Sequence, residues 1–125
     1  MFLDLEKAQY GCPAMDLAHA SLRPSARWDP DCDHVWTAGE TAGFVAAWCA
    51  AAGPSLAAAV QPWLVPYRRL VWLRTTAMYW RRLSREDVLA PLEPGVARHA
   101  AAIMADALDP LTIAAVRAEW LVTAS

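Results

Sequence analysis

The pattern of hydrophobic and polar residues predicts a chain made mostly of helices. Thr37 and Glu40 have the spacing of a capping box and predict a helix that continues to Ala52, where Gly53-Pro54 ends it. The longest predicted helix covers Pro66–Leu83, because apolar side chains recur there at steps of three and four residues. The residues with this spacing are Trp63, Tyr67, Leu70, Val71, Ala77 and Met78.

Turn-forming residues divide the remaining sequence into shorter elements. The residues from 23 to 36 contain two prolines and three acids and are predicted to form a loop. Asp109-Pro110 supplies an N-cap and a first-turn proline for a last helix that ends near Val122. The other predicted helices are Ala14–Leu22, Ser55–Val60 and Val96–Leu108.

The first twenty residues combine a short strand, a turn and a helix. Phe2–Leu5 is long enough for a strand and too short for a helix, and it carries Asp4. Tyr10–Pro13 contains the glycine and proline of a turn, and the helix that follows carries Asp16. Acids at a strand end and on the next helix are typical of a site that binds metal and phosphate.

This segment resembles the part of the aminoglycoside phosphotransferase and choline kinase family that follows the catalytic loop. The family pattern is two hydrophobic residues, Asp, a hydrophobic residue and Glu, then Tyr-Gly-Asp-Pro, then Asp-Leu-Ala. The resemblance implies that Asp4 holds Mg²⁺ against the phosphates of ATP, and that Asp16 braces the catalytic loop. Glu6, two residues along an extended strand from Asp4, is expected to assist through water. Cys12 stands where the family has Asp, which is tolerable at a turn position.

The resemblance implies a mainly α fold, namely the C-terminal helical lobe of a protein-kinase-like α+β fold with one short N-terminal strand. Residues 1–125 are expected to form a single domain. A kinase of this family also needs a His-Gly-Asp catalytic loop and a lysine that pairs with phosphate, and Lys7 is the only lysine in the sequence. We therefore interpret the chain as the C-terminal part of a small-molecule kinase, from a truncated or split gene or a longer protein, and expect it to be inactive alone.

The implied reaction is the transfer of phosphate from ATP to a hydroxyl group of an aminoglycoside or another amino alcohol. By the same resemblance, Asp29, Asp31 and Asp33 lie near the substrate cleft, where they would meet the ammonium groups of a cationic substrate. Together with Cys32 and His34 they also suggest a metal cluster, but the glycine and the distal Glu of an EF-hand loop are missing. A solvated acidic loop is the favoured interpretation.

Composition and charge narrow the classes of function. With 57% hydrophobic and 19% charged residues the chain is expected to fold, which argues against disorder. A net charge of −2 gives no overall attraction to nucleic acid or to an anionic membrane. Arginines alternate with aromatic residues over 68–85, as on a nucleic-acid surface, but an amphipathic helix explains this pattern better. The uncharged residues 41–67 are predicted to form a buried helical core, because prolines and alanines argue against a membrane span.

The cysteines, and an N-terminal sequence without the pattern of a signal peptide, indicate a cytoplasmic protein. Cys12, Cys32 and Cys49 are odd in number and widely spaced, which argues against a disulfide framework or a zinc site.

The alternative hypothesis for function is a non-catalytic helical interaction or dimerisation module that is the remnant of a kinase-like protein. The expected partners are a small-molecule substrate in the full enzyme, and a second copy of the chain or a missing N-terminal half. Neither nucleic acid nor a membrane is an expected partner.

Overall fold

The computed structural model describes residues 11–85, 89 and 92–122, the last three of these by their backbone only. These residues form helices joined by short connections and contain no strand, which confirms the prediction of a mainly helical chain. The strand predicted at Phe2–Leu5 lies outside the described residues. The helices are α1 (Pro13–Ala20), α2 (Arg23–Ala26), α3 (Ala38–Ala52), α4 (Pro54–Val60), a 3₁₀ turn (Gln61–Trp63), α5 (Leu64–Leu83), α6 (Pro94–Leu108) and α7 (Pro110–Val122).

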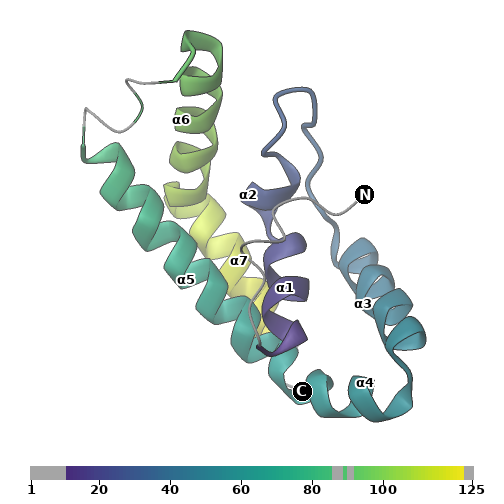
Figure 1. The fold of residues 1–125 in the computed structure, drawn as a ribbon. Coiled ribbons are helices and arrows are strands. Elements are labelled where there is room, and N and C mark those ends of the chain that lie inside the picture. The colour runs from purple at the N-terminus through teal and green to yellow at the C-terminus, as the bar shows by residue number, and fades with distance from the viewer. Residues whose placement is uncertain (1–10, 86–88, 90–91, 123–125) are drawn as a thin grey trace.

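The long helix α5 is the element on which the others assemble. Helices α1 and α6 pack against it, and both lie to its upper right in Figure 1. Helix α7 packs against α6, and α2 packs against α1 and α6. Helix α3 packs mainly on α4 and stands apart from the bundle (Figure 1).

The core lies where α1, α5 and α6 meet. Ile103 and Met104 of α6 are the largest fully buried side chains, with 2% and 1% of their surface exposed. Trp72 and Tyr79 of α5 pack with them, and Leu22 closes the cluster next to α2. A smaller cluster joins the start of α1 to the end of α4 through Ala14, Leu17 and Val60. Burial of these apolar side chains supplies most of the stability of the bundle.

Sequence patterns located several helix ends correctly. Thr37 Oγ1 accepts a hydrogen bond from the Glu40 amide at 3.2 Å, and the Glu40 carboxylate accepts one from the Thr37 amide at 2.8 Å, which confirms the capping box. Gly53 ends α3 with a φ of 84°, a conformation that glycine adopts without strain. The last helix begins at Pro110 and its Asp109 side chain accepts from the Leu111 amide, as the sequence predicts.

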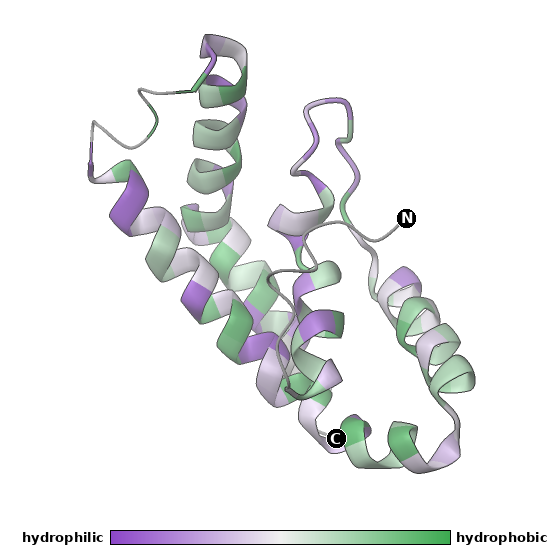
Figure 2. Cartoon of the chain, viewed as in Figure 1, coloured by the Kyte–Doolittle hydropathy of each residue, from purple (hydrophilic) through white to green (hydrophobic). Residues whose placement is uncertain are grey.

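Residues 41–67 do not form a buried core, and this prediction is wrong. No residue of α3 is buried, and Val60 is the only core residue in the segment. The α3 helix is rich in alanine and consists mainly of hydrophobic residues (Figure 2), yet among the described residues it packs mainly on the short helix α4. Its composition fits a buried helix, whereas its position does not bury it.

Two further predictions differ from the structure. The predicted loop 23–36 begins with the short helix α2, because Pro24 fits the first turn of a helix. The predicted apolar face of α5 is correct only in part. Val71 is buried, and Tyr67 and Met78 pack against the core, but Leu70 and Ala77 are exposed. Trp72 and Tyr79, which the pattern did not include, face the core. Both faces of this helix are rich in apolar residues, so periodicity alone does not identify the buried one.

Within the described part of the chain, no helix taken alone has the length and apolar character needed to cross a membrane. The α6–α7 pair passes such a test by length and composition only when its two helices are joined, and the chain bends by 60° between them. The uncharged segment 41–67, for which a membrane span was the alternative to a buried core, is divided among α3, α4, the 3₁₀ turn and the start of α5.

Candidate functional site

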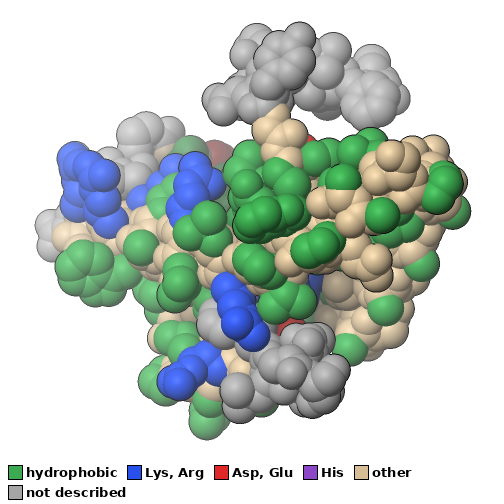
Figure 3. Space-filling view, turned by 90° about the horizontal axis from the view of Figure 1, so that it is seen from below, with side chains coloured by type: hydrophobic (Ala, Val, Ile, Leu, Met, Phe, Trp, Pro, Cys, Tyr) green, Lys and Arg blue, Asp and Glu red, His purple; other side chains and the backbone are tan. Residues whose placement is uncertain are grey.

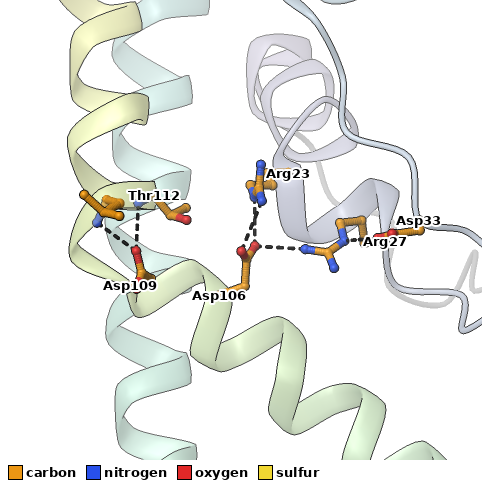
Figure 4. A network of polar contacts seen from close by, with 7 residues as sticks. Arg23, Arg27, Asp33, Asp106, Asp109 and Thr112 are labelled. Atoms are coloured by element: carbon orange, nitrogen blue, oxygen red, sulfur yellow. Dashed lines mark hydrogen bonds and ion pairs between the residues drawn. The ribbon is translucent and has the colours of Figure 1, made fainter.

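A cluster of charged side chains joins α2 to α6. Arg23 donates from Nε and Nη2 to the two carboxylate oxygens of Asp106, at 2.8 and 3.1 Å. Arg27, directly after α2, donates from Nη1 to the same carboxylate at 2.9 Å and from Nε to Asp33 at 2.9 Å. Figure 4 shows Asp106 between the two guanidinium groups. One carboxylate thus fixes two arginines that lie far from it in the sequence.

The charges of this cluster shift the pKa values of its members. The hydrogen bond from Arg23 lowers the pKa of Asp106, and the positive charges of Arg23 and Arg27 lower it further, while burial acts in the opposite direction. The same hydrogen bond raises the pKa of Arg23. Asp106 is therefore ionised near neutral pH and its lone pairs are occupied. Such a group holds structure together and does not act as a general acid or base.

A cavity of about 280 Å³ lies beside this cluster. Arg68 is one of its lining residues; it donates from Nη1 to Ser21 Oγ at 2.7 Å, and its Nη2 lies 3.6 Å from the Glu119 carboxylate. Trp36 and Trp72 supply apolar walls from the segment before α3 and from α5. No described residue that lines the cavity is a histidine or a cysteine. The cavity therefore combines a largely apolar lining with the charged groups of Arg23, Arg68 and Glu119.

A second and more open cavity, of about 460 Å³, lies between α1 and the end of α5. Arg82 supplies a positive charge and His19 an imidazole ring, and Trp28 and Met78 form part of the apolar wall. Tyr79 also lines it, and burial raises the pKa of its phenol. The phenol is therefore a neutral hydrogen-bonding group near neutral pH and not a base.

The sequence-predicted site residues occupy different parts of the chain. Asp4 and Glu6 lie outside the described residues. Asp16 lies in the first turn of α1 and is exposed, and it makes no hydrogen bond or ion pair with another described residue. The three loop acids line neither cavity: Asp29 accepts from the Asp31 amide in a turn, and Asp33 pairs with Arg27.

The described residues contain no group of three or more His, Cys, Asp or Glu side chains that is placed to hold a metal ion. Asp29, Asp31 and Asp33 are all exposed, as the solvated-loop interpretation predicts, and His34 lies 3.2 Å from the Glu40 carboxylate. The sequence did not reveal the pairing of Arg23 and Arg27 with Asp106. Single charges separated by 79 and 83 residues carry no local pattern that would show it.

Comparison with known proteins finds no matching protein-family model, no matching curated protein and no matching solved structure. A function for the chain is therefore inferred from its own residues and their placement.

Proposed function

We propose that this chain is the helical C-terminal part of an ATP-dependent small-molecule kinase that transfers phosphate to a hydroxyl group. The nucleotide lobe and the catalytic loop would come from another segment or another chain, because the 125 residues contain no His-Gly-Asp loop. The proposal rests on the sequence resemblance of residues 2–20, and the placement of Asp16 is the structural observation that supports it.

Helix α1 presents Asp16 in the way that a bracing acid requires. Leu17 and Ala18, the neighbours of Asp16 in the Asp-Leu-Ala motif, are buried with 4% of their surface exposed, so they fix α1 against α5. Asp16 lies on the opposite face, exposed and unpaired among the described residues. A rigid helix with a free carboxylate on its outer face suits an acid that accepts hydrogen bonds from a loop supplied by another segment.

The two carboxylates of Asp4 and Glu6 match the oxygen ligands that Mg²⁺ prefers. In the proposed enzyme Asp4 would bind the ion directly and Glu6 would bind it through water. The ion would neutralise charge on the phosphates of ATP during transfer. Asp16 would hold the catalytic loop in place and would not contact the reacting atoms.

The acids of the loop before α3 suggest which acceptor this enzyme would use. Asp29 and Asp31 are exposed and have no cationic partner among the described residues, whereas the charge of Asp33 is compensated by Arg27. Two free carboxylates close together in the sequence favour a substrate with ammonium groups, such as an aminoglycoside or another amino alcohol.

A second function, a non-catalytic interaction module, is favoured by a different observation. Large apolar side chains remain exposed on several helices, among them Trp63 at 54% and Trp80 at 66%. Figure 3 shows hydrophobic side chains over much of one face of the molecule. Apolar surface of this kind is typical of a chain that is covered by a partner.

Titration with a fluorescent ATP analogue separates these two functions. With the upstream segment or partner chain that supplies the nucleotide lobe present, the kinase proposal predicts binding that requires Mg²⁺, is lost in Asp4→Asn and is retained in the control Asp31→Asn. A protein that forms dimers and gives no nucleotide signal in any of the three forms would support the interaction module instead. Binding of an oligonucleotide with a steep dependence on salt would contradict both.

A further inference from the structure

The face of α5 that points away from the core carries a continuous apolar stripe. Leu70, Leu73, Ala77 and Trp80 follow one another at steps of three and four residues, the spacing of the a and d positions of a coiled coil. Leu70 and Leu73 are each 58% exposed and Trp80 is 66% exposed, while Val71, Trp72, Thr75 and Tyr79 form the buried face. We call these four exposed residues the α5 seam.

One edge of the α5 seam is positively charged. Arg74 and Arg81, seven residues apart and therefore on the same side of the helix, flank the seam at the positions that make charge contacts in coiled coils. Both side chains are exposed, and neither forms a hydrogen bond or ion pair with another described residue. The sequence has no acid between Thr41 and Arg85, so no residue near them in the sequence offsets their charge.

The seam is open to a partner along its length. Helices α1 and α6 both contact the opposite side of α5, so the side that carries the seam faces away from them (Figure 1). None of the four seam residues lines either cavity. In the view from below, arginine side chains lie among hydrophobic ones over the half of the molecule that α5 occupies (Figure 3). The surface therefore offers a ridge for a helix and not a pocket for a small molecule.

We propose that the α5 seam is the docking surface for an amphipathic helix of a partner protein, in which acidic side chains flank an apolar stripe. The apolar stripe of that helix would cover Leu70, Leu73, Ala77 and Trp80. Its acidic side chains would pair with Arg74 and Arg81, which fix the register of the two helices. This inference rests on α5 alone and is independent of the proposed kinase function.

Charge argues against a second copy of the chain as the occupant. In an antiparallel pair of α5 helices, Arg74 of one chain would lie opposite Arg81 of the other along the same edge, and like charges there oppose association. In a parallel pair, Arg81 of one chain would face Thr76 of the other, so it would have no acid to pair with. A helix with acidic edges has neither conflict.

Two designed peptides of three heptads provide the probes for this proposal. Both have leucine at the a and d positions; one has glutamate at every e and g position and the other has lysine there. Fluorescence anisotropy of each labelled peptide is measured against the full chain. We expect the glutamate peptide to bind roughly tenfold more tightly or better. The chain has a net charge of −2, so non-specific attraction would favour the lysine peptide and the test is conservative.

Variants locate the binding surface. The double variant Arg74→Glu/Arg81→Glu is expected to reverse the preference between the two peptides. A matched control, Arg98→Glu/Arg117→Glu, makes the same change in net charge on exposed residues of α6 and α7 and should leave the preference intact. Leu70→Ser/Leu73→Ser should weaken the binding of the glutamate peptide roughly tenfold. All these residues are exposed, and circular dichroism checks that each variant keeps its helices.

Several outcomes would overturn the proposal. Equal affinity for the two peptides, or no binding of either, would show that the seam does not select an acidic helix. A preference that survives Arg74→Glu/Arg81→Glu would place the surface elsewhere. Sedimentation equilibrium that shows a dimer abolished by Leu70→Ser/Leu73→Ser would make a second copy the occupant. An oligonucleotide that displaces the glutamate peptide and binds more tightly would make the surface one for nucleic acid.

Discussion

The carboxylate of Asp106 accepts two hydrogen bonds from the guanidinium of Arg23, at 2.8 and 3.1 Å, across 83 residues of sequence. Arg23 belongs to the short helix α2 and Asp106 to α6, so the pair connects the N-terminal helices to the C-terminal ones. Arg27 donates to the same carboxylate at 2.9 Å, and its own carbonyl oxygen lies 2.9 Å from His99 Nε2. Every one of these contacts requires α2 to rest on α6.

Replacement of Asp106 is expected to loosen this connection. Asp106→Asn leaves Arg23 and Arg27 beside a neutral amide, and it should lower the free energy of unfolding by about 1–2 kcal/mol, because the pair is partly exposed to solvent. Urea denaturation measures the change, with Asp31→Asn as a control acid on the exposed loop. An unchanged midpoint for Asp106→Asn would show that α2 is held by packing alone.

The stability of the chain should depend on Asp106 in acid. Its pKa is lower in the folded chain than the ordinary value, mainly because of the hydrogen bond from Arg23. The unfolded chain therefore binds this proton more readily, so the stabilisation by Asp106 is complete above about pH 4 and is lost as pH falls through the folded pKa.

Urea midpoints measured between neutral and acid pH test this dependence. The wild-type chain is expected to lose more stability below about pH 4 than Asp106→Asn does. Other carboxylates also contribute to the acid response, so the difference between the two proteins is the quantity to measure. Parallel profiles for the two proteins would contradict the assignment.

The core between α5 and α6 should respond strongly to truncation. Ile103 is 2% exposed, and Ile103→Ala is expected to lower the free energy of unfolding by about 2–4 kcal/mol, since the lost side chain leaves a cavity. Leu111 is 81% exposed, and Leu111→Ala should change the free energy of unfolding by less than about 0.5 kcal/mol. Similar costs for the two variants, measured by urea denaturation, would place the core elsewhere.

The capping box at Thr37 should control the first turn of α3. In Thr37→Ala the Glu40 amide loses its hydrogen bond to Thr37 Oγ1, and its protection from hydrogen exchange should fall roughly fivefold. Thr76→Ala is a suitable control, because Thr76 Oγ1 donates only to carbonyl groups of its own helix. Unchanged exchange in Thr37→Ala would mean that other contacts, such as the packing of Trp36 on Phe44, fix this end of the helix.

Local signals in the sequence predicted the helices well. The capping box at Thr37, the stop at Gly53-Pro54 and the start at Asp109-Pro110 depend on residues within a few positions of each other, and the structure has all three. The start of α5 was predicted at Pro66, but the helix begins at Leu64 because proline fits the first turn of a helix.

Features that depend on distant residues were harder to predict. Periodicity identifies an apolar face, but α5 has apolar residues all round, and only its packing with α1 and α6 selects Trp72 and Tyr79 for the core. The apolar composition of α3 predicted burial that the described residues do not provide. The Arg23–Asp106 pair depends on the whole fold and has no local signal. Asp4 and Glu6 lie outside the described residues, so their role stays a prediction.

The central claim, that this chain is the helical part of a small-molecule kinase, is tested most directly by the intact mass of the protein from its native cells. The measurement includes sequencing of the peptide that contains Met1 and of any chain that co-purifies. We predict an upstream extension, or a partner chain, that carries a His-Gly-Asp loop. A native chain that starts at Met1 and has no such partner would contradict the claim.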